Sequence, residues 1–298
     1  MENKIKQNTN HNSNRNRKKI ITMCIVLVLS LGAMAGFAIA LVLNIYTIGQ
    51  GQDFYTDLSV EFRPRDTQAT QALQNPIPTQ DSIGFLANEE ADEDGQGQEG
   101  YVSEEYMLEE SAFFIDFDAM QEIFPDIVGW IQSEGTVINY PIVQGLNNDF
   151  YLYHLPDGSR HVMGSIFLDY RNSPYFTDQS IIIYGHDMRS GDMFGSLRHY
   201  ANQLYFEQHS SMFIFTPNQE YKLVLFAGYI LDSAFEVPPM SFNDAEDFER
   251  FISNIKKRSI FTSDVEVNFG DRLMFLATCV ASGSINDRLI IVGKLEAV

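Results

Sequence analysis

The sequence predicts a mainly β domain, closed or nearly closed on itself, attached to a single N-terminal membrane helix. Short apolar runs separated by turn residues fill the C-terminal part of the 298-residue chain, as is typical of closed β structures. An uncharged apolar run at residues 20–43 is long enough to cross a bilayer. A polar, acidic stretch separates these two parts. The predicted organisation is therefore an anchor, a linker and one globular domain.

The N-terminal end predicts a single-pass membrane protein. Residues 1–19 hold six Lys or Arg against one Glu and form the predicted cytoplasmic tail. Because positive charge stays on the cytoplasmic side, everything after residue 45 is expected to lie outside the cell. The alternative is a cleaved signal peptide with Ala33-Met34-Ala35 as its cleavage site. The apolar run continues beyond these alanines, which favours the membrane helix.

Residues 44–110 are predicted to be an acidic flexible linker. Residues 50–110 hold fifteen acids against two arginines, with prolines at 64, 76 and 78. Apolar residues are too sparse there to offset the entropy lost on ordering. A flexible chain of this length has a root-mean-square span of about 45 Å. We therefore expect the linker to hold the domain off the membrane while keeping it nearby.

The secondary structure of the domain at 111–298 is predicted from the spacing of its apolar residues and turn residues. The strand-like runs are residues 128–131, 137–143, 164–169, 180–184, 221–230, 265–267, 273–279 and 289–292. A short helix is expected at 117–124, closed by Pro125. A longer helix is expected at 243–258, with Asn243 or Asp244 as its cap, apolar residues at helical spacing and basic residues at its end.

Composition and missing motifs exclude several classes of function. The net charge of −20 argues against nucleic acid, whose phosphates require a basic surface. There is no CxxC, no HExxH and no phosphate-binding glycine loop, so neither a metal nor a cofactor is predicted.

Cys279 is the candidate nucleophile. It ends the apolar run at 273–279, and the chain's other cysteine, Cys24, lies in the membrane run. Cys279 therefore has no partner for an internal disulfide, although its domain faces an oxidising space. A lone thiol there is either reactive or a buried structural cysteine, and the sequence leaves both interpretations open.

His186 and Arg288 are the candidate partners of that thiol. His186 follows the strand at 180–184, where Gly185 would let the backbone turn and leave the imidazole over an open site. Arg288 opens the strand after that of Cys279 and can donate two hydrogen bonds to a developing oxyanion. The alternatives are a capping or core histidine, and a surface ion pair of Arg288 with Asp287 or Asp271. The domain's other histidines are predicted to be surface residues: His154, His161, His199 and His209.

Three motifs resemble those of the sortases, over roughly residues 113–298. The motifs are Tyr184-Gly185-His186-Asp187-Met188, Phe275-Leu276-Ala277-Thr278-Cys279 and the strand led by Arg288. The helix at 243–258 is similar to the helix-bearing insertion of class B sortases. The resemblance implies an eight-stranded sortase β-barrel with an N-terminal helix and a helix in the long loop before the penultimate strands.

The resemblance also implies an enzyme, a cysteine transpeptidase of a Gram-positive cell surface. Cys279 would attack the Thr carbonyl of a sorting signal of the LPxTG or NPxTN kind and form a thioester, with His186 as acid and base and Arg288 on the oxyanion. Leu276, Ala277 and Thr278 would contact the substrate. The implied partners are surface proteins that carry a sorting signal and an amine of a peptidoglycan precursor.

Other functions remain compatible with the same residues. The site could serve a pilin polymerase or a surface cysteine endopeptidase that uses water, and a non-enzymatic tethered module is the third hypothesis. Three residues also depart from the family pattern. Phe275 stands where Thr is usual, Ala277 where class B members often have Ser, and Asp187 where Asn is frequent. An acid beside His186 would favour the protonated imidazole if it pointed inward.

Overall fold

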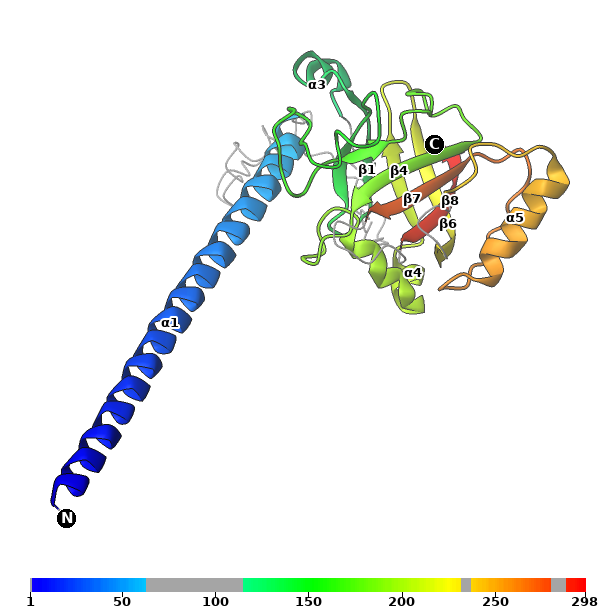
Figure 1. Cartoon of the computed structure of the whole chain (residues 1–298). Coiled ribbons are helices and arrows are strands. Elements are labelled where there is room, and N and C mark those ends of the chain that lie inside the picture. The colour runs from blue at the N-terminus through cyan, green and yellow to red at the C-terminus, as the bar shows by residue number, and fades with distance from the viewer. Residues whose placement is uncertain (1, 63–114, 232–236, 280–287) are drawn as a thin grey trace, which may run out of the picture.

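A computed structural model describes residues 2–62, 115–231, 237–279 and 288–298; side chains are not described for residues 2–22, 24, 25, 28 and 279. A long N-terminal helix leads to a β-barrel that carries short helices on its outside (Figure 1). Only the C-terminal end of the long helix lies against the barrel, and the rest extends away from it (Figure 1).

The helix α1 (Glu2–Glu61) is continuous and much longer than the predicted membrane run. Residues 44–61 are helical, which corrects the first part of the predicted flexible linker; residues 63–114 lie outside the described residues. This segment is helical because side chains at helical spacing are buried on one of its faces. Tyr55, Leu58 and Phe62 recur at helical spacing and are buried against the barrel, so tertiary packing outweighs the acidic composition.

The apolar part of α1 fits a membrane anchor. Its described apolar side chains from Met23 to Tyr46 are exposed, with no cover from the rest of the chain. The segment Leu29–Glu61 contains a window that is long and apolar enough to cross a bilayer, a test that a signal sequence also passes. The orientation, with the N-terminus in the cytoplasm, stays a prediction.

The barrel confirms the predicted eight-stranded fold. Its strands are β1 (Ile127–Gln132), β2 (Asn139–Val143), β3 (Ile166–Leu168), β4 (Ser180–His186), β5 (Ser211–Phe215), β6 (Glu220–Ile230), β7 (Leu273–Cys279) and β8 (Leu289–Ala297). They pair in the order β1-β2-β3-β4-β7-β8-β6-β5, and β5 pairs with β1 to close the barrel. The pairs β2–β3 and β4–β7 are parallel, and the other pairs are antiparallel.

The helices lie outside this barrel. They are α3 (Phe117–Ile123), the 3-10 helix η1 (Gly195–Ala201), α4 (Gln203–Gln208) and α5 (Ala245–Lys257). The predicted helix at 243–258 is therefore α5, in the connection between β6 and β7. The carboxylate of Asp244 caps it by accepting from the Asp247 backbone N–H at 2.8 Å. Phe248, Ile252 and Ile255 form its buried face.

Two local expectations differ from the structure. The predicted strand at 265–267 forms no β-ladder, although Val265 and Val267 pack against the hydrophobic cluster outside the barrel. Alternation alone cannot make a strand here, because closure of the barrel leaves no free edge to pair with. Strand β5 and the helices η1 and α4 were not predicted, since their short runs lack clear periodicity.

Alternate residues of β7 divide the core into two layers. Met274 and Leu276 belong to the cluster inside the barrel, whereas Phe275 and Ala277 belong to the cluster outside it. The Phe275 ring lies 6.0 Å from that of Phe251 on α5, centroid to centroid. Phe275, the residue that departs from the Thr of the family motif, therefore packs against α5.

A buried carboxylate follows strand β3. Arg171 donates to both oxygens of Asp169, at 2.8 and 2.7 Å, and Asn148 and Tyr184 also donate to it. Burial of the Asp169 carboxyl tends to raise its pKa, but the hydrogen bonds from Arg171 and Asn148 outweigh burial and lower it below 3.8.

The lowered pKa predicts an acid-sensitive contribution to stability. A carboxyl whose folded pKa is depressed stabilises the fold above its ordinary pKa, and this contribution is lost as the pH falls through the folded value. Asp169→Asn should therefore cost about 2 kcal/mol at neutral pH, and the cost should shrink below pH 4. Chemical denaturation of the full chain in micelles from pH 7 to pH 2 measures it, with exposed Asp264→Asn as control. A cost independent of pH would contradict the prediction.

Candidate active site

His186 and Cys279 are paired at the ends of two neighbouring strands, and Arg288 directly precedes the next strand, β8. The parallel ladder of β4 and β7 pairs His186 with Cys279. The antiparallel ladder of β7 and β8 ends at Ala277 and Ile290, two residues before Cys279 and two residues after Arg288. Adjacent strands are about 4.8 Å apart. Three residues that are far apart in sequence therefore meet at one end of the barrel.

His186 is held by a main-chain carbonyl. Its imidazole is 1% exposed, and its Nε2 lies 2.6 Å from the Leu152 carbonyl oxygen. A carbonyl can only accept, so Nε2 must donate, and in the neutral ring this assigns the lone pair to Nδ1. Nδ1 is therefore the nitrogen that can take up and release a proton, while Leu152 fixes the orientation of the ring.

Gly185 is required by packing rather than by a turn. It lies within strand β4 and is not among the residues with positive φ, so the expected sharp turn is absent. A Cβ at this position would come within 2.4 Å of Ile166 Cδ1 and 2.8 Å of the Phe194 ring. The absence of a side chain lets these residues pack directly beneath the strand next to His186.

Asp187 does not face the imidazole of His186. Successive residues of a strand point to opposite faces. The Asp187 carboxylate forms an ion pair with Arg198, and both side chains are partly exposed. This departure from the family pattern therefore places its charge on the surface beside the site.

An open pocket of about 480 Å³ lies beside the imidazole. It is lined by Thr47, Tyr153, Arg160, His161, Val162 and His186. The Tyr153 ring is 6.0 Å from the imidazole, centroid to centroid. Thr47 belongs to α1, so the N-terminal helix forms one side of the pocket, a contribution that the linker prediction had excluded.

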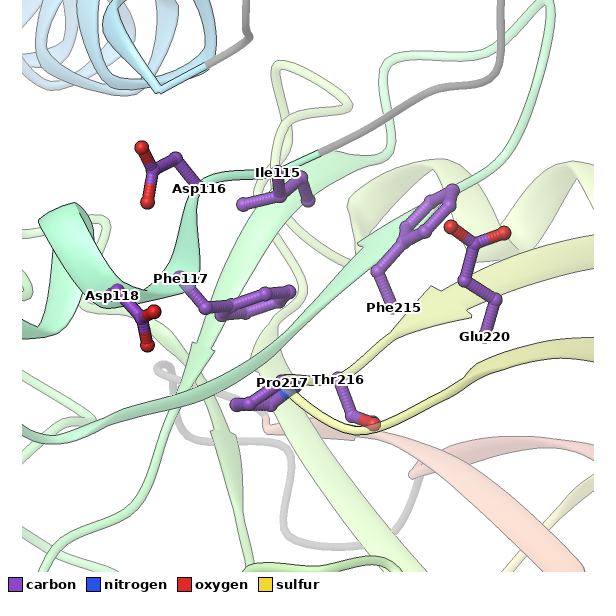
Figure 2. Close-up of a pocket in the computed structure, with 8 residues that line it drawn as sticks. All are labelled: Ile115, Asp116, Phe117, Asp118, Phe215, Thr216, Pro217 and Glu220. Carbon is purple, nitrogen blue, oxygen red and sulfur yellow. The ribbon is translucent and has the colours of Figure 1, made fainter.

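A smaller pocket of about 150 Å³ lies between α3 and the turn joining β5 to β6 (Figure 2). It brings together the Phe117 and Phe215 rings and the carboxylates of Asp116, Asp118 and Glu220. Neither cysteine nor histidine lines it, so it lacks the thiol and the imidazole on which the proposed chemistry depends.

Two histidines that were predicted to be surface residues instead form hydrogen bonds with main-chain carbonyls of segments distant in sequence. His161 Nε2 lies 2.8 Å from the Thr47 carbonyl, and His209 Nδ1 lies 3.1 Å from the Glu134 carbonyl. Both rings are partly buried. The sequence did not predict these contacts or the contact of His186 with Leu152. Every residue has a main-chain carbonyl, so the residue type does not indicate which carbonyl will accept a hydrogen bond.

Known proteins resemble the chain over the barrel. Sortase B of Listeria monocytogenes is 36% identical over 177 residues, which cover 59% of this chain and 72% of that protein. Sortase B of Staphylococcus aureus is 33% identical over 180 residues, covering 60% and 74%. The chain belongs to the class B sortases. No protein-family model matches it.

The solved structures of sortase B agree with this assignment. A Staphylococcus aureus sortase B–substrate complex superposes with a TM-score of 0.59 and 33% identity, covering 61% of this chain and 85% of that one. The protein is thus a sortase transpeptidase, an enzyme whose class acts on sorting-signal substrates and amine nucleophiles. The match confirms the resemblance to class B sortases that the sequence motifs indicated.

The predicted substrate-contacting residues of this sortase are all buried. Leu276 lies inside the barrel and Ala277 in the outer cluster. The Thr278 hydroxyl accepts from the Leu289 backbone N–H at 3.0 Å and donates to the Leu289 carbonyl at 3.3 Å. Their observed contacts are with the barrel, and substrate contact by them stays a prediction.

The Thr278 hydroxyl is expected to stabilise the strand end that carries Arg288. Thr278→Val keeps the side-chain shape but removes the hydrogen bonds to Leu289, so the free energy of unfolding should fall by about 1.5 kcal/mol. Thr278→Ser keeps the hydroxyl and is the control. Chemical denaturation of both variants measures the difference, and a Val variant as stable as the Ser variant would remove this role.

Proposed function

We propose that this sortase cleaves a sorting signal of the LPxTG or NPxTN kind after its Thr, through a thioester on Cys279, and transfers the protein to a cell-wall amine. The observation that carries the proposal is the pairing of His186 with Cys279 at the ends of β4 and β7, with Arg288 directly before the neighbouring strand β8. A proton carrier and a fixed cation on either side of a thiol are what acyl transfer through a thioester requires.

In the first half-reaction, the Cys279 thiolate attacks the Thr carbonyl of the signal. The Arg288 guanidinium stabilises the oxyanion of the tetrahedral intermediate. As the Thr–Gly bond breaks, His186 donates its Nδ1 proton to the leaving amine. The first product is a peptide with a new N-terminus, and the protein remains on Cys279 as a thioester.

In the second half-reaction, an amine attacks the thioester. Neutral His186 takes the proton of the amine at Nδ1, the C–S bond breaks, and Cys279 leaves as the thiolate. The Leu152 carbonyl supports both steps, because its hydrogen bond to Nε2 holds the ring and stabilises its positive charge. The net change is exchange of one amide bond for another.

The membrane helix supports the proposed location. With the tail of residues 1–19 in the cytoplasm, the barrel lies outside the cell, where sorting-signal proteins and peptidoglycan precursors are found. A pilin polymerase would use the same chemistry with a lysine side chain as the amine, and an endopeptidase would use water.

The test uses the full chain in detergent micelles and a panel of peptides with LPxTG-like and NPxTN-like sequences. Each peptide is incubated with triglycine, with a lysine amide or without an amine, and the products are read by mass spectrometry. A peptide joined to triglycine, absent from a His186→Ala control, supports cell-wall transfer. Joining only to the lysine amide indicates the polymerase. Cleavage that ignores every amine indicates the endopeptidase, and no reaction with any peptide removes the proposed motif.

A further inference from the structure

One face of α1 contacts the segments that surround His186. The contact residues are Thr47, Gly51, Gln52 and Tyr55. Farther along the chain, Leu58 and Phe62 are also buried, and the Phe62 ring packs against Phe124. Thr47, Gly51, Tyr55, Leu58 and Phe62 follow one another at spacings of three or four residues, which is the spacing of a single helical face, and Gln52 lies next to Gly51. The first contact is the hydrogen bond from His161 Nε2 to the Thr47 carbonyl, while His161 Nδ1 accepts from the Met163 backbone N–H at 3.2 Å.

The helix packs tightly against His161 and Met163 at Gly51. A Cβ there would lie 2.4 Å from His161 Cε1 and 2.6 Å from Met163 Sδ, so any side chain would push α1 and these residues apart. Next to it, Gln52 Nε2 donates to both carboxylate oxygens of buried Asp192, at 2.9 and 3.0 Å.

Tyr55 makes the deepest contact. Its hydroxyl donates to the Gly164 carbonyl at 2.6 Å, and its ring packs edge-on against Tyr140 with 5.2 Å between centroids. Burial raises the pKa of the Tyr55 hydroxyl, so the group remains protonated as a donor.

A series of contacts connects Tyr55 to the imidazole of His186. Gly164 lies directly against Leu152, since a Cβ on Gly164 would be 2.3 Å from the Leu152 oxygen. Ser165 N–H donates to the Tyr151 carbonyl at 2.8 Å, and its hydroxyl donates to the His154 carbonyl at 2.8 Å. The segment 151–154 is thus fixed on 164–165, and its Leu152 carbonyl receives His186 Nε2.

The other flank of His186 is also tied to α1. Asp192, which accepts from Gln52, lies in the loop after β4, and Phe194 N–H at the end of that loop donates to the His186 carbonyl at 3.0 Å. α1 therefore holds the segment before and the segment after the catalytic histidine.

We propose that residues 47–55 of α1 are part of the catalytic framework: they hold the segments 151–165 and 187–194 in place and so position the His186 imidazole. Tyr55 and Gln52 are positioning residues, because they touch His186 only through other groups. The effect on turnover rests on the proposed transpeptidase function, whereas the effect on the imidazole does not.

Two glycines of α1 provide the matched test. Gly51→Leu introduces a side chain where α1 meets His161 and Met163, and Gly49→Leu introduces the same side chain where nothing lies within 4 Å. Both changes raise helix propensity equally. The full-length variants in micelles are compared by kcat and KM, by the NMR titration of His186 assigned with a His186→Asn spectrum, and by hydrogen exchange of the Ser165 amide.

The expected result separates the two variants. Gly51→Leu should lower kcat about tenfold with little change in KM, because the imidazole is displaced but the peptide still binds. It should shift the His186 titration and speed exchange at Ser165 about tenfold. Gly49→Leu should match wild type in all three.

The other possible results distinguish failure of the positioning role from failure of the proposed function. If the His186 titration and the Ser165 exchange of Gly51→Leu equal those of wild type, the positioning role is overturned, whatever the activity. If wild type transfers no peptide while Gly51→Leu alters the titration and the exchange, the proposed function fails and the positioning role stands. Equal changes in both leucine variants would assign the effect to the helix itself and overturn the proposal.

Discussion

Cys279→Ala should lower the rate of acyl transfer to less than about one-thousandth of the wild-type rate while the barrel remains folded. Alanine cannot form the thioester, so both half-reactions lose their covalent intermediate. The amine-dependent product measured by mass spectrometry reports the rate, and trapping of the acyl-enzyme reports the intermediate. Circular dichroism of the full chain verifies the fold.

The chain offers a matched control for this change. Cys24, its other cysteine, lies on α1 within the membrane run, far in sequence from the barrel. Cys24→Ala should keep the wild-type rate and the trapped intermediate. A folded Cys279→Ala variant that still joins the peptide to the amine would show that Cys279 is not the nucleophile.

Gly164→Ala should lower kcat/KM about a hundredfold, although Gly164 makes no contact with His186. Its φ of +53° is strained for any other residue, and its Cβ would overlap the Leu152 carbonyl that orients the imidazole. The new methyl group must move the carbonyl, and the imidazole moves with it. Kinetics on the full chain, with thermal unfolding alongside, measure the effect.

Gly158→Ala separates strain from displacement. Gly158 also has a positive φ, +78°, but nothing lies within 4 Å of its Cβ position. Both variants should lose about 1 kcal/mol of stability from the left-handed backbone. Only Gly164→Ala should lose activity. Equal activity of the two variants would mean that the Leu152 carbonyl does not set the orientation of His186.

The barrel was predictable, and the candidate site residues could be placed on it, because their signals are local in sequence. Strands β4, β7 and β8 are continuous apolar runs, and each candidate residue stands at the end of one of them. Helix α5 has a cap, an apolar face and charges suited to its dipole. Each element carries its own pattern, so it could be recognised without knowledge of its neighbours.

The role of α1 could not be predicted in the same way. Acidic composition suggested a flexible linker from residue 44, but the contact face from Thr47 to Phe62 depends on a few residues at helical spacing among polar ones. Their burial needs a surface formed by residues a hundred positions later, such as Asp192 and Gly164. Composition describes the average of a segment, whereas docking depends on one of its faces.

The unbroken course of α1 sets the height at which the enzyme works. Where residues 20–43 span a bilayer, Thr47 lies only four residues beyond the span, about 6 Å along a helix. Thr47 lines the pocket of His186, so in the proposed location that pocket would open at the level of the lipid headgroups. From the proposed location it would follow that enzyme and substrate meet by lateral diffusion within the membrane plane. Encounter would then be a two-dimensional search that favours clients held in the same bilayer.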